Sequence, residues 1–423
     1  MNQLETATYS ASRDFFGWRV VWAAFTVAVF GWGFGFYGPS VFLHAIHEAR
    51  GWSVPLVSAG LTAHYLWGAF IVANLPSLHR RFGVARVTQA GAAALALGIV
   101  GWAFAAEPWQ LFAATPISGA GWALTGTAAI NAMVSPWFVR RRPVALSIAL
   151  NGSSLGGVGM TPIWVAAIAA FGFPRAALLT GAVSVALVGW FAIRYLAQTP
   201  AGMGQLPDGD GRGAPKPVAP APAALALPGA QLWRSPQFLT IVGGLSIGLF
   251  AQIGLIAHLY SLLVPAFGAQ GAAWGMGLAT TCAVLGRSLL GWLMPPQANR
   301  RRIAALAYSV QIIGSIAFLA AAGDNILLLV LGILFFGIGI GIPVSLPPLI
   351  AQVEFAPSDV LRVVALTTAI SQATYAFAPA AFGVLRGVAQ TGGETGAAPW
   401  LFGAAAAAQF LGAMVYVCGK QRR

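Results

Sequence analysis

The sequence predicts an all-α integral membrane protein with twelve transmembrane helices in two pseudo-symmetric six-helix bundles. Three observations support this fold class: an apolar composition, twelve apolar stretches of spanning length, and a repeat that relates the two halves. Hydrophobic residues make up 58% of the 423 residues and charged residues only 8%, with a mean hydropathy of +0.76. A soluble fold could not bury that much apolar surface, which excludes a soluble enzyme, a disordered chain and a disulfide scaffold.

Twelve stretches reach the length of about 20 apolar residues that a spanning helix needs. The turns between them are short and carry Gly, Pro or Arg, and the long apolar runs lack the alternation of a β-barrel. The first span follows a polar segment without a small-residue cleavage site, so we expect no cleavable signal. The predicted spans are 17–43, 54–78, 87–105, 109–134, 144–171, 176–193, 237–264, 272–294, 303–322, 326–350, 363–386 and 399–418.

A segment rich in proline and glycine divides these spans six and six. Residues 198–233 hold seven prolines and almost no branched apolar residues, a composition typical of a flexible linker rather than a domain. We therefore expect an N-terminal six-helix bundle over 1–197, a cytoplasmic linker over 198–233 and a C-terminal six-helix bundle over 234–423.

The basic residues predict the orientation. With the N-terminus and the linker in the cytoplasm, 19 of the 23 Lys and Arg residues face that side and three face the other, as the positive-inside rule requires. We expect a bacterial inner-membrane protein with both termini cytoplasmic. The net charge of +13 is then explained by topology and by contact with anionic membrane lipid, without a nucleic-acid partner.

The two halves match at an offset of 220 residues. Such parallel six-helix repeats are an architecture of secondary transporters, with the substrate site near the middle of the membrane between the halves. The matching features are Arg142-Pro143-Val144-Ala145-Leu146-Ser147 with Arg362-Val363-Val364-Ala365-Leu366-Thr367, Gly119 and Gly121 with Gly339 and Gly341, and Arg80-Arg81 with Arg300-Arg301.

Four motifs resemble one transporter family. They are Asp14-Phe15-Phe16-Gly17-Trp18, Gly119-Ala120-Gly121, Trp137-Phe138-Val139-Arg140-Arg141-Arg142-Pro143-Val144-Ala145-Leu146 followed by Asn151-Gly152-Ser153-Ser154-Leu155-Gly156, and Gly286-Arg287 through Gly291. With these motifs the chain resembles the major facilitator superfamily, and within it the monocarboxylate porter and oxalate/formate antiporter branches. The resemblance implies transport by alternating access.

The loop between the second and third spans departs from the superfamily's pattern. It reads Pro76-Ser77-Leu78-His79-Arg80-Arg81-Phe82-Gly83, with Pro and Arg where the pattern has Gly and Asp. The carboxylate that pairs across the cytoplasmic gate is therefore missing, and we expect this gate to use different contacts. The residues that we assign to this gate are Arg80, Arg81, Gly83, Arg141, Arg142 and Arg362.

Arg287 is the basic residue that falls inside a predicted span. An arginine at a helix centre costs roughly 2.5–3.5 kcal/mol on insertion scales, and all ten acidic residues lie at span ends or in loops. A carboxylate substrate would supply the missing counter-ion through two hydrogen bonds to the guanidinium. The alternative is that Arg287 extends to the cytoplasmic headgroups. The resemblance supports substrate binding, although Ala283 replaces the Asp that monocarboxylate porters often carry one turn earlier.

Further residues complete the predicted site. Tyr37 lies among glycines that permit close helix contact and local unwinding, and Trp67 precedes Arg287 by the repeat offset. His258 and His64 lie inside spans and are candidates for proton coupling, with hydrogen bonding to a neighbouring carbonyl as the alternative. Asn151, Gln372 and Tyr375 lie on polar stripes that line either the site or helix contacts.

We predict a secondary transporter of a small organic anion, most simply a monocarboxylate, working by proton symport or anion exchange. The alternatives are a drug or metabolite exporter of the same fold, a non-transporting sensor, and a lipid-moving protein. No enzyme motif is present, and we expect a monomer without a metal or other cofactor. His44, His47 and Glu48 resemble a metal cluster, but their place at a span's exit favours interfacial anchoring.

Overall fold

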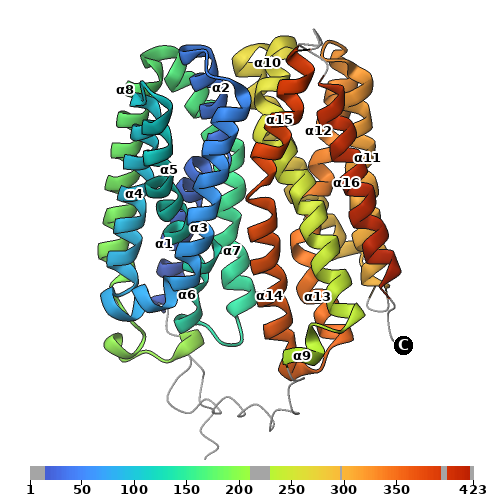
Figure 1. Cartoon of the computed structure of the whole chain (residues 1–423). Coiled ribbons are helices and arrows are strands. Elements are labelled where there is room, and N and C mark those ends of the chain that lie inside the picture. The colour runs from blue at the N-terminus through green and yellow to red at the C-terminus, as the bar shows by residue number, and fades with distance from the viewer. Residues whose placement is uncertain (1–14, 210–228, 296–297, 392–397, 420–423) are drawn as a thin grey trace, which may run out of the picture.

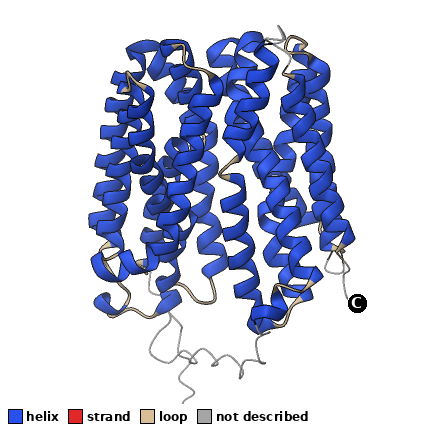
Figure 2. Ribbon diagram, in the orientation of Figure 1, coloured by secondary structure: helices blue, strands red, loops and turns tan. Residues whose placement is uncertain are grey.

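The computed structural model describes residues 15–209, 229–295, 298–391 and 398–419, and every regular element in those ranges is a helix or helical turn (Figure 2). Two helical bundles stand side by side in Figure 1, the first coloured from blue to green and the second from yellow to red. This arrangement confirms the predicted all-α fold with two halves.

The first bundle ends in a long helix that turns back on itself. Its elements are α1 (Gly17–Gly35), α2 (Gly38–Arg50), α3 (Val54–Phe82), α4 (Val84–Phe104), α5 (Pro108–Thr125), α6 (Thr127–Val134), η1 (Ser135–Trp137), α7 (Arg142–Leu155), η2 (Gly156–Met160), α8 (Thr161–Phe191) and η3 (Ala192–Leu196).

The second bundle begins with the longest helix of the chain. Two helical turns, η4 (Ala201–Met203) and η5 (Pro207–Gly209), precede it in the predicted linker. Its elements are α9 (Gly229–Leu232), α10 (Pro236–Leu293), α11 (Arg300–Ala321), α12 (Ile326–Ile340), η6 (Pro343–Ser345), α13 (Leu346–Glu354), α14 (Pro357–Tyr375), α15 (Ala378–Thr391) and α16 (Pro399–Cys418).

Seven stretches of the described helices are long and apolar enough to cross a membrane, and two of them contain 55 residues. Each of those two holds a glycine with a positive φ, Gly172 at 75° and Gly268 at 67°, where the chain turns and begins a second pass. Glycine adopts this conformation without the penalty of a Cβ. Three more passes are made by shorter helices in pairs: α5 with α6, α12 with α13, and α14 with α15. The described helices therefore account for the twelve predicted spans.

Several passes are interrupted where the sequence carries glycine or proline. The first pass breaks at Phe36 and Tyr37, between the glycine-rich end of α1 and the Gly38-Pro39 start of α2. The tenth pass breaks between α12 and α13, where η6 begins at Pro343. Proline removes a backbone donor and glycine tolerates close packing, so both breaks follow from the local sequence.

The predicted linker is docked on the first bundle as far as Gly209, and residues 210–228 lie outside the described part. Asp208 is 7% exposed. Its carboxylate accepts hydrogen bonds from the backbone N–H groups of Arg140 at 2.8 Å, Arg141 at 3.1 Å and Val139 at 3.2 Å. We call the end of the molecule that carries this contact, the lower end in Figure 1, the linker face.

The repeat needs one correction. Arg80 and Arg81 lie in the last turn of α3, whereas Arg300 and Arg301 open α11. The helices that correspond in the two halves are α4, which follows its N-cap residue Gly83, and α11, which follows its N-cap residue Asn299. The repeat offset for this pair of helices is therefore 216 residues. The expected pairing of the two arginine pairs is therefore wrong, because the loops before α4 and α11 differ in length.

The two bundles are packed together toward the face opposite the linker. Thr62 of α3 accepts a hydrogen bond from the backbone N–H of Ala380 in α15 at 3.1 Å. One turn earlier in α3, Ser58 lies so close to Gly383 that a Cβ built on that glycine would be 2.6 Å from the Ser58 hydroxyl. A glycine at position 383 is therefore what lets α3 and α15 approach so closely.

Candidate functional site

Arg287 lies on the second pass of α10, 19 residues beyond the turn at Gly268 and thus about 28 Å along the helix from that turn. Its backbone packs on α12, since a Cβ built on Gly341 would be 3.3 Å from the Arg287 Cβ. The Arg287 side chain is exposed and makes no hydrogen bond or ion pair with any described residue. Within the described residues, Arg287 thus has no carboxylate partner.

Tyr37 stands at the break between α1 and α2 and reaches across to α10 of the other bundle. Its hydroxyl is hydrogen-bonded to that of Thr280 and lies close enough to Arg287 to interact electrostatically. Thr280 Oγ1 donates to the carbonyl of Met276 at 3.0 Å, so Tyr37 is the donor to Thr280. Gly157 makes room for the pair, because a Cβ built there would lie 2.7 Å from the Tyr37 ring and 2.6 Å from the Thr280 methyl group.

Thr280 and Arg287 lie on one face of α10, seven residues apart, which corresponds to two turns and about 10 Å along the helix axis. The Tyr37 and Thr280 hydroxyls therefore mark one end of a short polar strip and the Arg287 guanidinium marks the other. We call Tyr37, Thr280 and Arg287 the Tyr37–Arg287 site. It is built from both bundles, and it combines a cation with hydroxyl groups.

A second group of residues adjoins this site from α3 and α14. The rings of Tyr65 and Tyr375 meet edge to face, with centroids 6.1 Å apart, and Gln372 is hydrogen-bonded to Tyr375. Tyr65 is also close enough to Tyr37 to interact electrostatically. The structure thus connects the predicted residues Gln372 and Tyr375 to the Tyr37–Arg287 site through Tyr65.

Trp67 lies away from this group. It is 44% exposed, and its ring contacts Phe70, which is 61% exposed. Trp67 follows Tyr65 by two residues, so the two side chains leave α3 about 200° apart. Because Tyr65 faces the other bundle, Trp67 faces outward and does not approach Arg287, contrary to the expectation from the repeat offset.

Asn151 is exposed on α7, whereas Gly157, the residue that meets Tyr37 and Thr280, lies in the π-helical segment η2. The structure does not bring Asn151 into contact with the Tyr37–Arg287 site.

His258 lies on the first pass of α10, ten residues before Gly268, so it is much closer to the opposite face than Arg287. The side chain is fully buried, and its Nε2–H donates to the carbonyl of Pro379 at 3.1 Å. Its Nδ1 has no partner. Arg386 lies nearby and donates to the hydroxyl of Ser261. His258 therefore belongs to the closed contact between helices and not to the surroundings of Arg287.

His64 uses both ring nitrogens for helix packing. Nε2–H donates to the carbonyl of Gly35 at 3.1 Å, and Nδ1 lies 2.8 Å from the hydroxyl oxygen of Ser118. The same Ser118 oxygen accepts the indole N–H of Trp102 at 3.1 Å. Both ring nitrogens of His64 thus have partners at the junction of α1, α3 and α5, which is the alternative considered for it.

The predicted gate residues lie at the linker face. Arg142 donates to the carbonyls of Phe138 at 2.9 Å and Ser135 at 3.2 Å, which fixes the turn before α7. Arg80 donates to Ser77, and the Arg81 guanidinium lies 5.1 Å from the Phe82 ring centroid. Gly83 adopts a φ of +80° at the α3–α4 junction, and Arg141 and Arg362 are exposed.

The histidines of α2, at the end of the first pass away from the linker face, contact other groups of the protein. His47 Nδ1–H donates to the carbonyl of Trp52 at 2.7 Å, and the His44 ring lies 5.4 Å from that of Tyr260. Among the described residues no three His, Cys, Asp or Glu side chains gather as metal ligands would.

Two residues of the site escaped the sequence analysis. Thr280 shares a helix face with Arg287, and this spacing of seven residues was visible in the sequence as a polar position on an apolar span. Tyr65 carries no such pattern, because its importance comes from contacts with α14 of the other bundle. A single polar aromatic residue in a span does not reveal which helix it will meet.

A sequence model described as Major Facilitator Superfamily matches residues 23–379 of the chain. Human monocarboxylate transporter 11 is 30% identical over 228 residues, covering 51% of this chain and 43% of that protein. Bovine monocarboxylate transporter 13 is 28% identical over 292 residues, covering 66% and 61%. The chain thus matches about half the length of these curated relatives.

Solved structures share the fold at low sequence identity. The nucleoside transporter NupG aligns with a TM-score of 0.72 at 13% identity, covering 96% of this chain and all of that one. A D-xylose-proton symporter aligns with a TM-score of 0.71 at 12% identity, covering 96% and 99%. At such identities the likeness concerns the arrangement of the helices alone.

Proposed function

Because the chain belongs to the major facilitator superfamily, we propose that it is a secondary transporter of a small organic anion, most simply a monocarboxylate, and that Arg287 binds the carboxylate group. The observation that carries this proposal is the exposed Arg287 side chain, which lies within a membrane pass and makes no hydrogen bond or ion pair with any described residue. An unpaired charge within the membrane costs free energy. A ligand with the opposite charge would reduce this cost by pairing with Arg287, and this pairing would favour its binding.

The geometry of the Tyr37–Arg287 site supports a small carboxylate. A guanidinium presents two parallel N–H groups that match the two carboxylate oxygens. The Arg287 guanidinium is close enough to Tyr37 to interact electrostatically, so the Tyr37 and Thr280 hydroxyls can accept or donate to a hydroxyl or keto group on the same molecule. Because Tyr37 and Thr280 come from different bundles, the same ligand would respond to movement between them.

The curated relatives support the substrate class. Two proteins named as monocarboxylate transporters match between half and two thirds of this chain. An exporter that binds cationic drugs would need a carboxylate near the site. The described acidic residues instead lie at helix ends and in turns. These two arguments favour an anion over a cationic drug.

We propose that the linker face is cytoplasmic, since it carries most of the arginines and the positive-inside rule places them there. The contacts of α3 with α15 then close the outer side, while the exposed Arg287 lies about 28 Å along α10 from the Gly268 turn, toward the linker face. These contacts support an inward-facing arrangement as part of the proposal. Rocking of the two bundles about the Tyr37–Arg287 site would expose it to the other side.

Proton symport and anion exchange are both compatible with this site. The buried His258 has an unpartnered Nδ1, which could take up a proton without losing a hydrogen bond. His64 has no such free nitrogen. If transport is proton-coupled, His258 is therefore a better candidate than His64.

The test is uptake of labelled lactate, pyruvate, formate and oxalate into proteoliposomes by the wild type, Arg287→Ala and Arg287→Lys. Loss of a charge-assisted pair of hydrogen bonds predicts roughly a 10–100-fold lower kcat/KM for Arg287→Ala, with partial activity in Arg287→Lys because lysine keeps the charge but not the fork. Arg175→Ala, an exposed arginine near the turn on the opposite face, is the matched control. Full uptake by a folded Arg287→Ala protein would contradict the proposal.

A further inference from the structure

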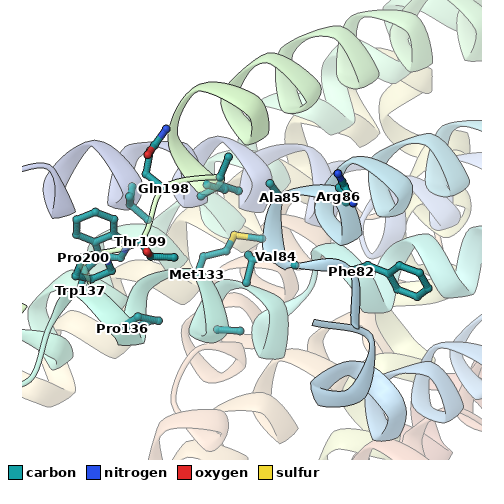
Figure 3. Close-up of a pocket in the computed structure, with 15 residues that line it drawn as sticks. Phe82, Val84, Ala85, Arg86, Met133, Pro136, Trp137, Gln198, Thr199 and Pro200 are labelled. Atoms are coloured by element: carbon teal, nitrogen blue, oxygen red, sulfur yellow. The ribbon is translucent and has the colours of Figure 1, made fainter. Parts of the chain in front are cut away.

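A cavity of about 300 Å³ lies in the first bundle at the linker face, away from the Tyr37–Arg287 site (Figure 3). It lies between the start of α4, the end of α6, the turn η1 and the segment that follows η3. The side chains that matter for its chemistry are Val20, Ala85, Arg86, Met133, Trp137 and Leu196.

The equivalent place in the second bundle is filled by one large side chain. Arg301 is the second residue of α11, as Ala85 is the second residue of α4. Arg301 is 1% exposed and is held by Glu354, by the hydroxyl of Thr240 at 2.8 Å and by the carbonyl of Gln237 at 2.9 Å. The first bundle has a methyl group where the second has a guanidinium.

The carboxylate partner of that guanidinium is also replaced by an apolar group. Glu354 is the last residue of α13, before the extended Phe355, and Trp137 is the last residue of η1, before the extended Phe138. Trp137 therefore occupies the place of the carboxylate. The cavity is the space that Arg301 fills in the other bundle, and it lacks the groups that would stabilise a buried charge.

The edge of the cavity is polar and positively charged. Figure 3 shows Arg86, Gln198 and Thr199 around it. Two more cations lie against the aromatic group that adjoins Trp137. The Arg19 guanidinium is 5.7 Å from the Phe16 ring centroid, and the Phe16 ring lies 5.4 Å from that of Trp137. The Arg194 guanidinium is 5.8 Å from the Tyr195 ring centroid, and the Tyr195 ring lies 5.9 Å from that of Phe16.

We propose that this cavity binds one acyl chain of an anionic phospholipid, with the lipid phosphate held by Arg86 at the edge. An apolar interior of this size suits a hydrocarbon chain, and the arginines beside it suit a negative headgroup. Basic pockets between transmembrane helices on the cytoplasmic side are known to favour such lipids. The second bundle has no need of the lipid, because Arg301 and Glu354 fill its equivalent space.

The experiment measures thermal unfolding of the full chain in detergent, with added phosphatidylglycerol or with phosphatidylcholine of the same acyl chains. We expect phosphatidylglycerol to raise the unfolding midpoint more, since a ligand of the native state stabilises it by mass action. Arg86→Gln should raise the half-saturating phosphatidylglycerol concentration roughly fivefold, from the loss of one charge near the headgroup. Arg302→Gln, at the equivalent position of α11 and also exposed, should leave it unchanged.

A second pair of variants tests the cavity itself. Ala85→Phe should fill it and abolish the difference between the two lipids, whereas Ala90→Phe, on an exposed face of the same helix, should retain it. Equal stabilisation by the two lipids would overturn the proposal. An undiminished phosphatidylglycerol effect in Ala85→Phe, or an equal effect of glycerol phosphate without acyl chains, would overturn the assignment of the cavity to a lipid chain.

Discussion

Arg301 and Glu354 form a bidentate ion pair, in which the Nε–Oε1 and Nη2–Oε2 distances are both 2.7 Å. Both side chains are at most 2% exposed. Arg287 lies in the same bundle and has no such partner among the described residues. Among the described residues, Arg301 is thus paired with a carboxylate and Arg287 is not. This contrast distinguishes an arginine that holds helices together from one that is available to a ligand.

The Arg301–Glu354 pair is expected to be essential for stability. Removing one partner leaves a buried charge uncompensated, which typically costs roughly 3–5 kcal/mol. We therefore expect Glu354→Ala to lower the free energy of unfolding of the detergent-solubilised protein by that amount, measured as a fall in the midpoint of thermal unfolding. Asp324→Ala, an acid in the turn before α12, is the control. An unchanged midpoint in Glu354→Ala would contradict the importance assigned to the pair.

The hydrogen bond between Tyr37 and Thr280 is expected to contribute to substrate transport as a pair. A double-mutant cycle with Tyr37→Phe, Thr280→Val and the double variant isolates the coupling between them. We expect each single variant to lower kcat/KM and the double variant to lower it by little more than one of them, with a coupling energy of about 1 kcal/mol. Strictly additive effects would show that the two hydroxyls act independently.

The twelve passes and their breaks could be predicted from the sequence, because they depend on local properties. The glycines around Tyr37 predicted local unwinding where the structure contains an interruption. Arg287 was recognisable for the same reason, since a charge in an apolar stretch is unusual wherever the helix packs.

The neighbours of Arg287 were harder to predict, because they depend on helix rotation and depth. Trp67 was placed near it by a constant repeat offset, but the loop lengths of the two halves differ and α3 turns this ring outward. His258 lies on the same helix element as Arg287 but on the other pass, so its depth in the membrane is different. The spacing of single residues in the sequence predicts neither the rotation of a helix about its axis nor the depth of a residue in the membrane.

The two buried histidines are expected to respond differently to the same substitution. His258→Asn removes the unpartnered nitrogen beside Arg386 and, if this group carries the proton, should abolish uptake driven by a pH gradient while exchange of internal for external substrate continues. His64→Asn breaks contacts to Gly35 and Ser118 and should lower stability by about 1–3 kcal/mol without separating the two transport modes. Proton-driven uptake that survives His258→Asn would remove this residue from the coupling mechanism.

Asp208 ties the linker to the turn before α7, and its titration makes this contact depend on pH. Burial alone would raise the pKa of Asp208, but the backbone N–H groups of Arg140, Arg141 and Val139 and the Arg140 charge outweigh that effect and lower it. A carboxyl with a lowered pKa in the folded state stabilises the contact fully above its ordinary pKa of about 3.9. That stabilisation is lost as the pH falls through the lower value.

A spin label at the exposed Leu206 can follow this contact. In a Cys282→Ala, Cys418→Ala background, Leu206→Cys should give a label that is immobilised at neutral pH and becomes mobile only below about pH 4, because the Asp208 carboxylate must be protonated before it releases the backbone N–H groups. Asp208→Asn cannot carry the charge, so its label should be mobile at every pH. If the label in Asp208→Asn were as immobile as in the parent, the carboxylate would not be what holds the linker on the first bundle.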